Sequence, residues 1–468
     1  MSRMPVLPNE QRPCYPTNQE RPALSMRFPA GFLFGAATSA HQIEGAADED
    51  GRGPSIWDTF AATPGAVTHG DTGAIACDHY HRVGDDLDLA AELGLTAYRF
   101  SIAWPRIIPD GVGSVNQKGL DFYRRMLDGL HARGIEPVAT LYHWDLPQPL
   151  QDAGGWASRD TAARFGDYAQ VVLDSLGDLV SRWVTVNEPF CSAMIGHLEG
   201  RHAPGQRDLH AALAAGHHLL LAHGQAVAIM RATAPGATVG ISHLFSDLRP
   251  ASPSADDEAA TRRLDGYENR WFLDPVATGS YPADMIDWYQ RQVPIDFIRD
   301  GDMRIVAAPT DFLGVNYYET KAVTHDPAEP YHQARALPST GQLTAGGLDV
   351  RPDGLGRILH RVSGQVSVPL YITESGAAFN DYADPEGGVD DLERVEYLAG
   401  HLGAALGAIG SGVDLRGYFV WSLLDNFEWA EGYGRRFGLV YVDFASQTRI
   451  PKASARWYRQ LITSQPGG

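Results

Sequence analysis

The sequence contains only three cysteines among 468 residues, Cys14, Cys77 and Cys191. None of them belongs to a CxxC pair, so we predict neither a disulfide framework nor a zinc ribbon. Disulfide-poor chains are typical of reducing compartments, and a cytoplasmic location is therefore expected.

Long apolar segments are also missing, because no run approaches the roughly 18 residues that a membrane-spanning helix needs. The stretch "MSRMPVLPNEQRPCYPTNQERPALS" at the N-terminus lacks the apolar centre of a secretory signal. Its prolines and polar residues predict a flexible arm over residues 1–27, followed by a folded domain over residues 28–464.

Basic residues are in deficit, with 38 Lys and Arg against 57 Asp and Glu and a net charge of −19. Nucleic acids and anionic membranes select basic surfaces, so we expect neither as a partner. The acidic surplus favours solubility. The sequence leaves the oligomeric state open, a homo-oligomer included.

Several catalytic and metal-binding motifs are absent. The chain has no HExxH or Cys/His metal set, no GxSxG elbow, no GxxxxGK[ST] loop and no GxGxxG coupled to a strand. The histidines of "DHYH" (78–81) and "GHHLLLAH" (216–223) are interpreted as ordinary helix or loop residues. We therefore predict no metal site and no serine-hydrolase, NTPase or Rossmann chemistry.

What the chain does contain is a regular alternation of apolar runs and amphipathic stretches. Continuous apolar runs are typical of strands buried on both faces, and strand–helix alternation favours a parallel sheet. Eight such units predict a single (β/α)₈ barrel with long loops above the C-terminal face. The predicted strands are residues 32–38, 97–103, 137–143, 182–187, 238–244, 311–317, 370–374 and 417–423, and the clearest helices are 85–94, 119–134, 159–178, 209–232 and 392–412.

Polar side chains collect at the C-terminal ends of these strands, where barrel enzymes carry their chemistry. Carboxylates and amides bind hydroxyl groups, and flat indoles stack on the apolar faces of a sugar ring. Two glutamates from different strands could flank a glycosidic bond as acid and nucleophile. The candidates are Gln42, Arg99, His143, Asn187, Glu188, Asn316, Tyr318, Glu374, Trp421, Glu428 and Trp429.

Each candidate also has an ordinary structural interpretation. A glutamate after an apolar strand is more often an ion-pair partner or a helix cap, and Arg99 could be its counter-ion. Trp421 and Trp429 could be core aromatics, because tryptophan is highly buried on average. The recurrence of such residues at one strand end after another is what favours a sugar site.

At these strand ends the sequence resembles glycoside hydrolase family one, the β-glucosidase family. The similarity runs from about Phe28 to Tyr458, with the family's motifs in the family's order. The motifs are "FLFGAATSAHQIEGA", "SIWDTF", "YRFSIAWPRI", "LYHWDLPQPL", "TVNEP", "HAPG", "RWFLDP", "FLGVNYY", "YITESG", "WSLLDNFEWAEGYGRRFGLVYVDF" and "RIPKAS".

The resemblance implies a barrel that hydrolyses β-glycosides with retention of configuration and without a cofactor. It implies that Glu188 is the general acid/base and Glu374 the nucleophile, kept ionised by Arg99 and Tyr318, which would lower its pKa. It further implies a glycone pocket. Its members would be Gln42 and Glu428 at the far edge of the ring, Trp421 as its floor, Asn187 beside the reacting carbon, and His143, Asn316 and Trp429.

Details of the motifs separate branches of the family. The phosphoglucosidase branch has Ser where Glu428 stands, so a carboxylate there favours unphosphorylated sugars. The thioglucosidase branch has Gln at the acid/base position, so Glu188 favours O-glycosides. A cellulose-derived β-glucoside is the expected substrate, with β-galactosides and β-fucosides as extensions.

Three positions depart from the family pattern. Ser375 replaces the usual Asn after the nucleophile, Leu348 stands where a Trp usually stacks on the leaving group, and His197 replaces a Tyr. Leu348 and His197 predict an altered aglycone site. The remaining alternatives are a family member that mainly transfers glycosyl groups, a sugar-binding barrel without catalysis, and an unrelated barrel hydrolase with paired acids.

Overall fold

The computed structural model describes residues 26–466. The predicted N-terminal arm, and Cys14 within it, therefore lies outside the described residues apart from Met26 and Arg27. No helix in the described part combines the length and the apolar character that crossing a membrane requires.

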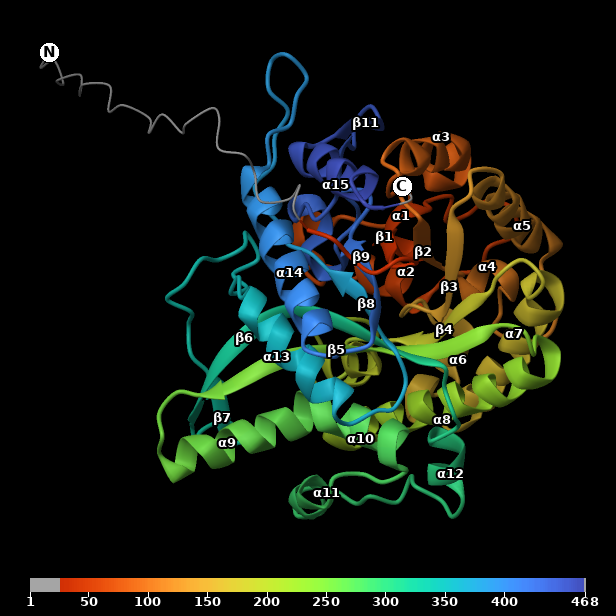
Figure 1. The fold of residues 1–468 in the computed structure, drawn as a ribbon. Helices are drawn as coiled ribbons and strands as arrows, with labels where there is room; N and C mark the ends of the chain where they lie inside the picture. The colour runs from red at the N-terminus through yellow and green to blue at the C-terminus, as the bar shows by residue number, and fades with distance from the viewer. Residues whose placement is uncertain (1–25, 467–468) are drawn as a thin grey trace, which may run out of the picture.

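Eight parallel strands close into a barrel, as the sequence predicts (Figure 1). They follow the order β5-β4-β3-β2-β1-β9-β8-β6, and pairing of β6 with β5 closes the ring. The barrel strands are β1 (Leu33–Ala37), β2 (Ala97–Ser101), β3 (Glu136–Tyr142), β4 (Arg182–Asn187), β5 (Thr238–Pro250), β6 (Phe312–His325), β8 (Leu370–Ser375) and β9 (Leu415–Trp421).

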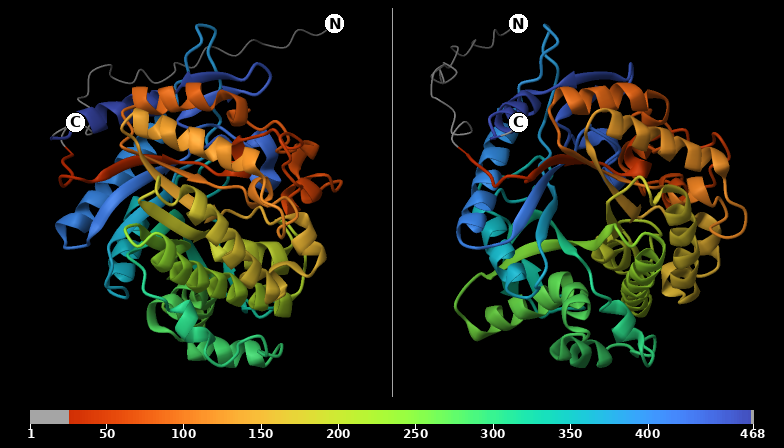
Figure 2. Two further views of the ribbon diagram at one scale, coloured as in Figure 1. Left: turned by 90° about the vertical axis from the view of Figure 1, so that its right-hand side faces the viewer. Right: turned by 45° about the vertical axis from the view of Figure 1, so that its right-hand side comes forward.

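Helices surround the strands on the outside of the barrel (Figure 2). The inner faces of these helices follow the helical spacing of the sequence. In α13 (Pro352–Ser363), Leu355, Ile358, Leu359 and Val362 are buried at i, i+3, i+4 and i+7. The long outer helices are α3 (His79–Glu92), α5 (Gln117–Ala132), α7 (Asp160–Leu176), α8 (Leu209–Thr233), α13 (Pro352–Ser363), α14 (Leu392–Gly410) and α15 (Ala453–Thr463).

Large aromatic side chains fill the interior of the barrel. Phe312, Tyr371 and Phe419 pack there in one buried cluster. Phe419 lies so close to β1 that a Cβ on Gly35 would sit 2.4 Å from its ring, which is why that strand position needs glycine. Because packed rings occupy the interior, the barrel is a core with its chemistry at one end rather than a pore.

The segment between β5 and β6 is folded rather than a set of loops. Both strands continue past the barrel and stay paired as far as Pro250 and Val323, and α9 (Ala255–Asp265) packs along them (Figure 1). The elements of this segment are α9 (Ala255–Asp265), η5 (Gly266–Arg270), α10 (Trp271–Thr278), α11 (Ala283–Gln290) and α12 (Asp302–Val306). The remaining short elements of the described residues are α1 (Ala40–Ile43), α2 (Ile56–Ala61), η2 (Thr68–Gly70), α4 (Trp104–Ile107), α6 (Gln148–Asp152), η3 (Gly155–Ala157), η4 (Cys191–Glu199), β7 (Ala334–Ala336), η6 (Trp429–Gly434), β10 (Val440–Asp443) and β11 (Thr448–Pro451).

Candidate active site

Glu374, near the end of β8, is buried, and each of its oxygens accepts a hydrogen bond. Nη1 of Arg99 donates to Oε1 at 2.5 Å, and the Tyr318 hydroxyl donates to Oε2 at 2.7 Å. Burial raises the pKa of Glu374 above its ordinary value, while Arg99 and Tyr318 act to lower it. Both neighbours therefore act in the direction that the sequence predicts, while removal from water opposes them.

Glu188 directly follows β4 and forms no ion pair with any residue between 26 and 466. The Asn316 side chain donates to Oε1 at 2.7 Å, and the thiol of Cys191 donates to Oε2 at 3.2 Å. Burial and the nearby Glu374 carboxylate raise the pKa of Glu188 to about 8. Glu188 therefore carries a proton at neutral pH, whereas the Arg99 guanidinium beside Glu374 favours the charged form of that carboxyl group.

Two asparagines connect the carboxyl groups. Asn187 accepts a bond from Nη2 of Arg99 at 2.7 Å and one from Asn316 at 3.1 Å. Asn316 also contacts both Glu188 and Glu374 through its side chain. Because one amide reaches both acids, the two carboxyl groups lie close together, as a direct displacement at a carbon between them requires.

Backbone irregularities aim these side chains into the mouth. The strand pairing shifts register between Val184 and Asn187 and again between Val315 and Asn316. Glu188 itself has a φ of 46°, a left-handed conformation that costs energy for a residue with a Cβ. Bulges and strained residues of this kind gather where a fold re-aims functional groups.

Aromatic rings form one wall of the site. His143, after β3, is stacked against Trp421 with ring centroids 5.7 Å apart and against Trp429 at 6.0 Å. Nε2 of His143 bonds the Asn187 side chain at 3.1 Å, and Nδ1 has no hydrogen-bond partner among residues 26–466. Burial, helped by Arg99, holds the pKa of His143 well below its usual value, so the ring is neutral and suited to binding a hydroxyl.

Glu428 and Gln42 form a polar edge beside these indoles. Nε2 of Gln42 donates to Glu428 Oε2 at 3.3 Å and to the Phe427 carbonyl at 2.9 Å, and Glu428 also bonds the Trp421 side chain. Burial and the Glu374 charge raise the pKa of Glu428 to about 8. Polar groups of this kind beside an indole are the surroundings a sugar hydroxyl needs.

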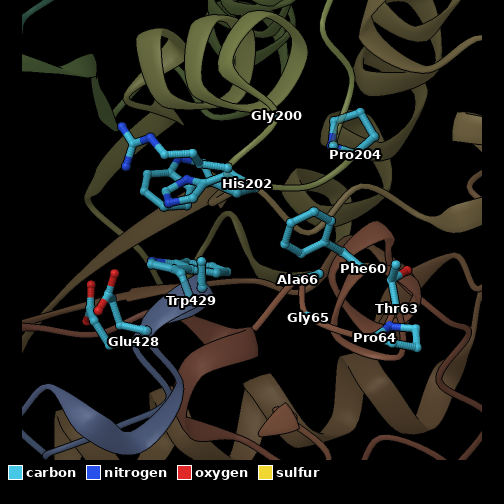
Figure 3. Close-up of a pocket in the computed structure, with 15 residues that line it drawn as sticks. Phe60, Thr63, Pro64, Gly65, Ala66, Gly200, His202, Pro204, Glu428 and Trp429 are labelled. Carbon is cyan, nitrogen blue, oxygen red and sulfur yellow. The ribbon is translucent and has the colours of Figure 1, made fainter. Parts of the chain in front are cut away.

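A cavity of about 650 Å³ opens beside this edge (Figure 3). Glu428 and Trp429 line one part of it, and Phe60 and His202 line another. Its size lies within the range of about 300–1,000 Å³ that is common for ligand sites. The polar edge is therefore reached from open space.

The structure brings together every site residue that the sequence predicts, and adds contacts that the motifs do not specify. Cys191 touches Glu188, and Trp144 donates its Nε1 proton to the Asn187 carbonyl at 3.0 Å. Trp144 follows His143 in "HWD", so the sequence places it at the same strand end, whereas nothing in the sequence marks Cys191. His197 is buried, and its Nδ1 lies 2.8 Å from the Ser192 carbonyl oxygen within η4.

Ser375 lies on the outer side of its strand, since neighbouring strand residues point to opposite faces. Its hydroxyl lies 3.1 Å from the Tyr397 hydroxyl on α14, away from the carboxyl pair. The side chain therefore belongs to the packing between the barrel and α14.

Ser375→Asn is expected to change kcat/KM less than tenfold and to lower the free energy of unfolding by about 1–3 kcal/mol, because the extra atoms overpack a buried contact. Denaturant unfolding and initial rates on an aryl glucoside measure both quantities. Ser375→Ala, which removes the hydroxyl without adding bulk, is the matched control. A rate increase of several orders of magnitude in Ser375→Asn would show instead that the serine impairs the site.

No group of three or more His, Cys, Asp or Glu side chains within residues 26–466 is arranged to hold a metal ion. The chemistry available from the residues present is that of two carboxyl groups with different protonation states. A parallel eight-stranded barrel with such a pair at the C-terminal ends of its strands defines a barrel glycosidase.

Comparison with known proteins is more specific. The family profile described as Glycosyl hydrolase family 1 matches residues 24–466, and the chain belongs to this family.

Relatives with known activities and structures extend over almost the whole chain. The chain is 47% identical to beta-glucosidase A of Thermotoga maritima over 93% of this chain and 98% of that protein. It is 45% identical to a bifunctional beta-D-glucosidase/beta-D-fucosidase of Bifidobacterium breve, over 94% and 99% of the two chains. The solved structure of the family 1 b-glucosidase from Thermotoga maritima superposes with a TM-score of 0.91 at 46% identity, covering 94% of this chain and 98% of that one.

Proposed function

We propose that the protein is a retaining β-glucosidase that removes terminal β-D-glucosyl residues from O-glycosides. The observation that carries the proposal is the unequal setting of the two buried glutamates: Glu374 pairs with Arg99, whereas Glu188 has only neutral donors. The family relationship and the names of the relatives support the same activity.

In the first step, Glu374 attacks the anomeric carbon while Glu188 protonates the leaving oxygen. Arg99 and Tyr318 keep the attacking carboxylate ionised and oriented through their bonds to its two oxygens. The bond from the anomeric carbon to the leaving oxygen breaks as an ester bond to Glu374 forms.

In the second step, Glu188 takes a proton from water, which attacks the same carbon and releases Glu374. Once Glu374 is esterified, its negative charge is gone, and with it one of the two causes that raise the pKa of Glu188. The acid of the first step thereby becomes a base, as microscopic reversibility requires.

Hydroxyl groups of the glycone would bind the polar residues around the pair. Gln42 and Glu428 suit the far edge of the sugar, Trp421 its face, and Asn187, Asn316, His143 and Trp429 the remaining hydroxyls. The name of the Bifidobacterium relative supports β-fucosides as additional substrates.

We further propose a cytoplasmic enzyme that acts on β-glucosides derived from cellulose. The intact carboxyl pair favours hydrolysis over the non-catalytic alternative.

The pH dependence of kcat/KM on a nitrophenyl β-glucoside tests the assignment of the acid. Glu188 must be protonated, and its pKa of about 8 keeps it so at neutral pH, so we expect kcat/KM to fall as the pH rises through about 8. On the acid side, activity should fall as Glu374 takes up a proton.

The configuration of the first product tests retention. Proton NMR of an early reaction mixture should show β-glucose before it mutarotates, because two successive displacements at one carbon restore its configuration. If α-glucose appeared first, the enzyme would be inverting and the nucleophile role of Glu374 would be wrong.

A second prediction concerns the part of the site that contacts the leaving group. Leu348 is half-buried in a turn where the Thr344 amide donates to the Leu348 carbonyl at 2.9 Å, and Ala345 ties this turn to Ala378, four residues after Glu374. A leucine cannot stack on a sugar as an indole does. Leu348→Trp should therefore raise the ratio of kcat/KM for cellobiose to that for an aryl glucoside by about 3–10-fold.

Leu343 provides the matched control, since it is exposed in the same segment. Leu343→Trp adds an indole of the same size and should leave the substrate ratio unchanged. A strong preference of the unmodified enzyme for cellobiose would contradict this account of Leu348.

A further inference from the structure

Cys191 is the first residue of η4, three residues after Glu188, and it is buried. Its backbone amide donates to the Glu188 carbonyl at 3.0 Å, and its thiol donates to Oε2 of the same residue at 3.2 Å. The turn that begins η4 therefore fixes the sulfur next to the carboxyl group that transfers the proton.

Each oxygen of Glu188 thus faces one neutral donor, Asn316 at Oε1 and Cys191 at Oε2. Asn316 supplies a full-strength amide bond, whereas a thiol is a weak donor and a weak acceptor. Burial raises the pKa of the Cys191 thiol well above its ordinary value, so it remains a neutral S–H group and adds no negative charge.

A weak donor at Oε2 suits a group that has to be an acid in one step and a base in the next. A strong donor would favour the carboxylate and lower the proton affinity of Glu188, which would harm the acid step. An apolar side chain would leave Oε2 without a partner when Glu188 is ionised, which would harm the base step.

We propose that Cys191 is a positioning residue for Glu188, whose thiol fixes Oε2 and balances the acid form against the base form. This inference rests on the proposed role of Glu188. It assigns a catalytic consequence to a side chain that is otherwise an ordinary buried cysteine.

Other charged and titratable groups also face Glu188. Those that act on it electrostatically are Arg99 on β2, Tyr318 on β6, Glu374 on β8 and Glu428 after β9. The neutral ring of His143, after β3, lies next to it through the Asn187 side chain. All of them stay in place when Cys191 is replaced, so a change in the alkaline limb of the pH profile reports the altered contact at Oε2.

The test compares Cys191→Ser and Cys191→Ala by the pH dependence of kcat/KM on an alkyl β-glucoside, whose poor leaving group makes the acid step limiting. Serine, a stronger donor, should move the alkaline limb to lower pH by about 0.5–1 unit, and alanine should move it to higher pH by a few tenths of a unit. Cys191→Val serves as the apolar variant if the alanine protein does not fold.

Cys77 offers a matched control. It is a second buried cysteine, and its thiol donates to the Asp425 carbonyl at 3.0 Å rather than to an ionisable group. Cys77→Ser should leave the alkaline limb in place, whatever its effect on the unfolding temperature.

If the alkaline limb of the pH profile stayed in place in both Cys191 variants, the inference would be overturned, and Cys191 would have a packing role only. If the alkaline limb moved in the same direction in Cys191→Ser and in Cys191→Ala, the inference would be overturned as well. Failure of the proposed function looks different, because Glu188→Gln would then retain full activity on the alkyl glucoside.

Discussion

Replacing Glu374 by alanine is expected to lower kcat/KM on a nitrophenyl β-glucoside by a factor on the order of 10⁴ or more. No other group in the described site is placed to form the ester: Glu188 holds a proton, and Glu428 is engaged with Gln42 and Trp421. Loss of an activated nucleophile removes the covalent route altogether. Initial rates at saturating and subsaturating substrate measure the loss.

Azide distinguishes loss of the nucleophile from loss of the fold. In Glu374→Ala, azide should enter the space left by the carboxylate and attack from that face, giving an α-glycosyl azide. Glu374→Gln keeps the side-chain volume and the neighbours Arg99 and Tyr318, yet it should be equally inactive. Full activity in either variant would contradict the role of Glu374.

Replacing Glu188 by alanine is the second large effect, and its size should depend on the leaving group. An alkyl β-glucoside needs protonation of its leaving oxygen, so its rate of ester formation should fall by about 10²–10⁴-fold. A dinitrophenyl glucoside needs little help to leave, so its first step should survive and the ester on Glu374 should accumulate. A burst of dinitrophenol in stopped-flow kinetics reports that accumulation.

Azide again gives the control, with the opposite stereochemistry. It should attack the ester from the face that Glu188 leaves open and produce a β-glycosyl azide, while the alkaline limb of the pH profile disappears. Equal losses on the alkyl and dinitrophenyl glucosides would argue that Glu188 has only a structural role.

The barrel was predictable because its strands are short continuous apolar runs separated by amphipathic stretches. A run such as "LYITE" has one stable environment, a sheet covered on both faces, and eight of them in alternation with helices leave few architectures. The folded segment between β5 and β6 was less predictable. Its helices and strand extensions are stabilised by contacts with each other, which local patterns do not record.

The site residues were predictable because they stand at strand ends, which meet at one rim of a barrel. What could not be predicted is which atom contacts which. Tyr318 lies 56 residues from Glu374 along the chain and Arg99 lies 275 residues away, yet each donates to a different oxygen of it. The pKa of Glu374 depends on burial as well as on these partners, and the degree of burial could not be read from the motifs.

The sequence by itself determined the barrel, the family and the residue types at the mouth, because hydrophobic periodicity and local motifs are properties of neighbouring residues. Only the tertiary structure decided the state of each acid. Proton affinity depends on burial and on charges brought together from distant strands, so Arg99 beside Glu374 and Cys191 beside Glu188 had to be observed in space. Tertiary structure likewise decided that Ser375 faces α14 rather than the substrate, since the strand's orientation sets which side chains enter the barrel.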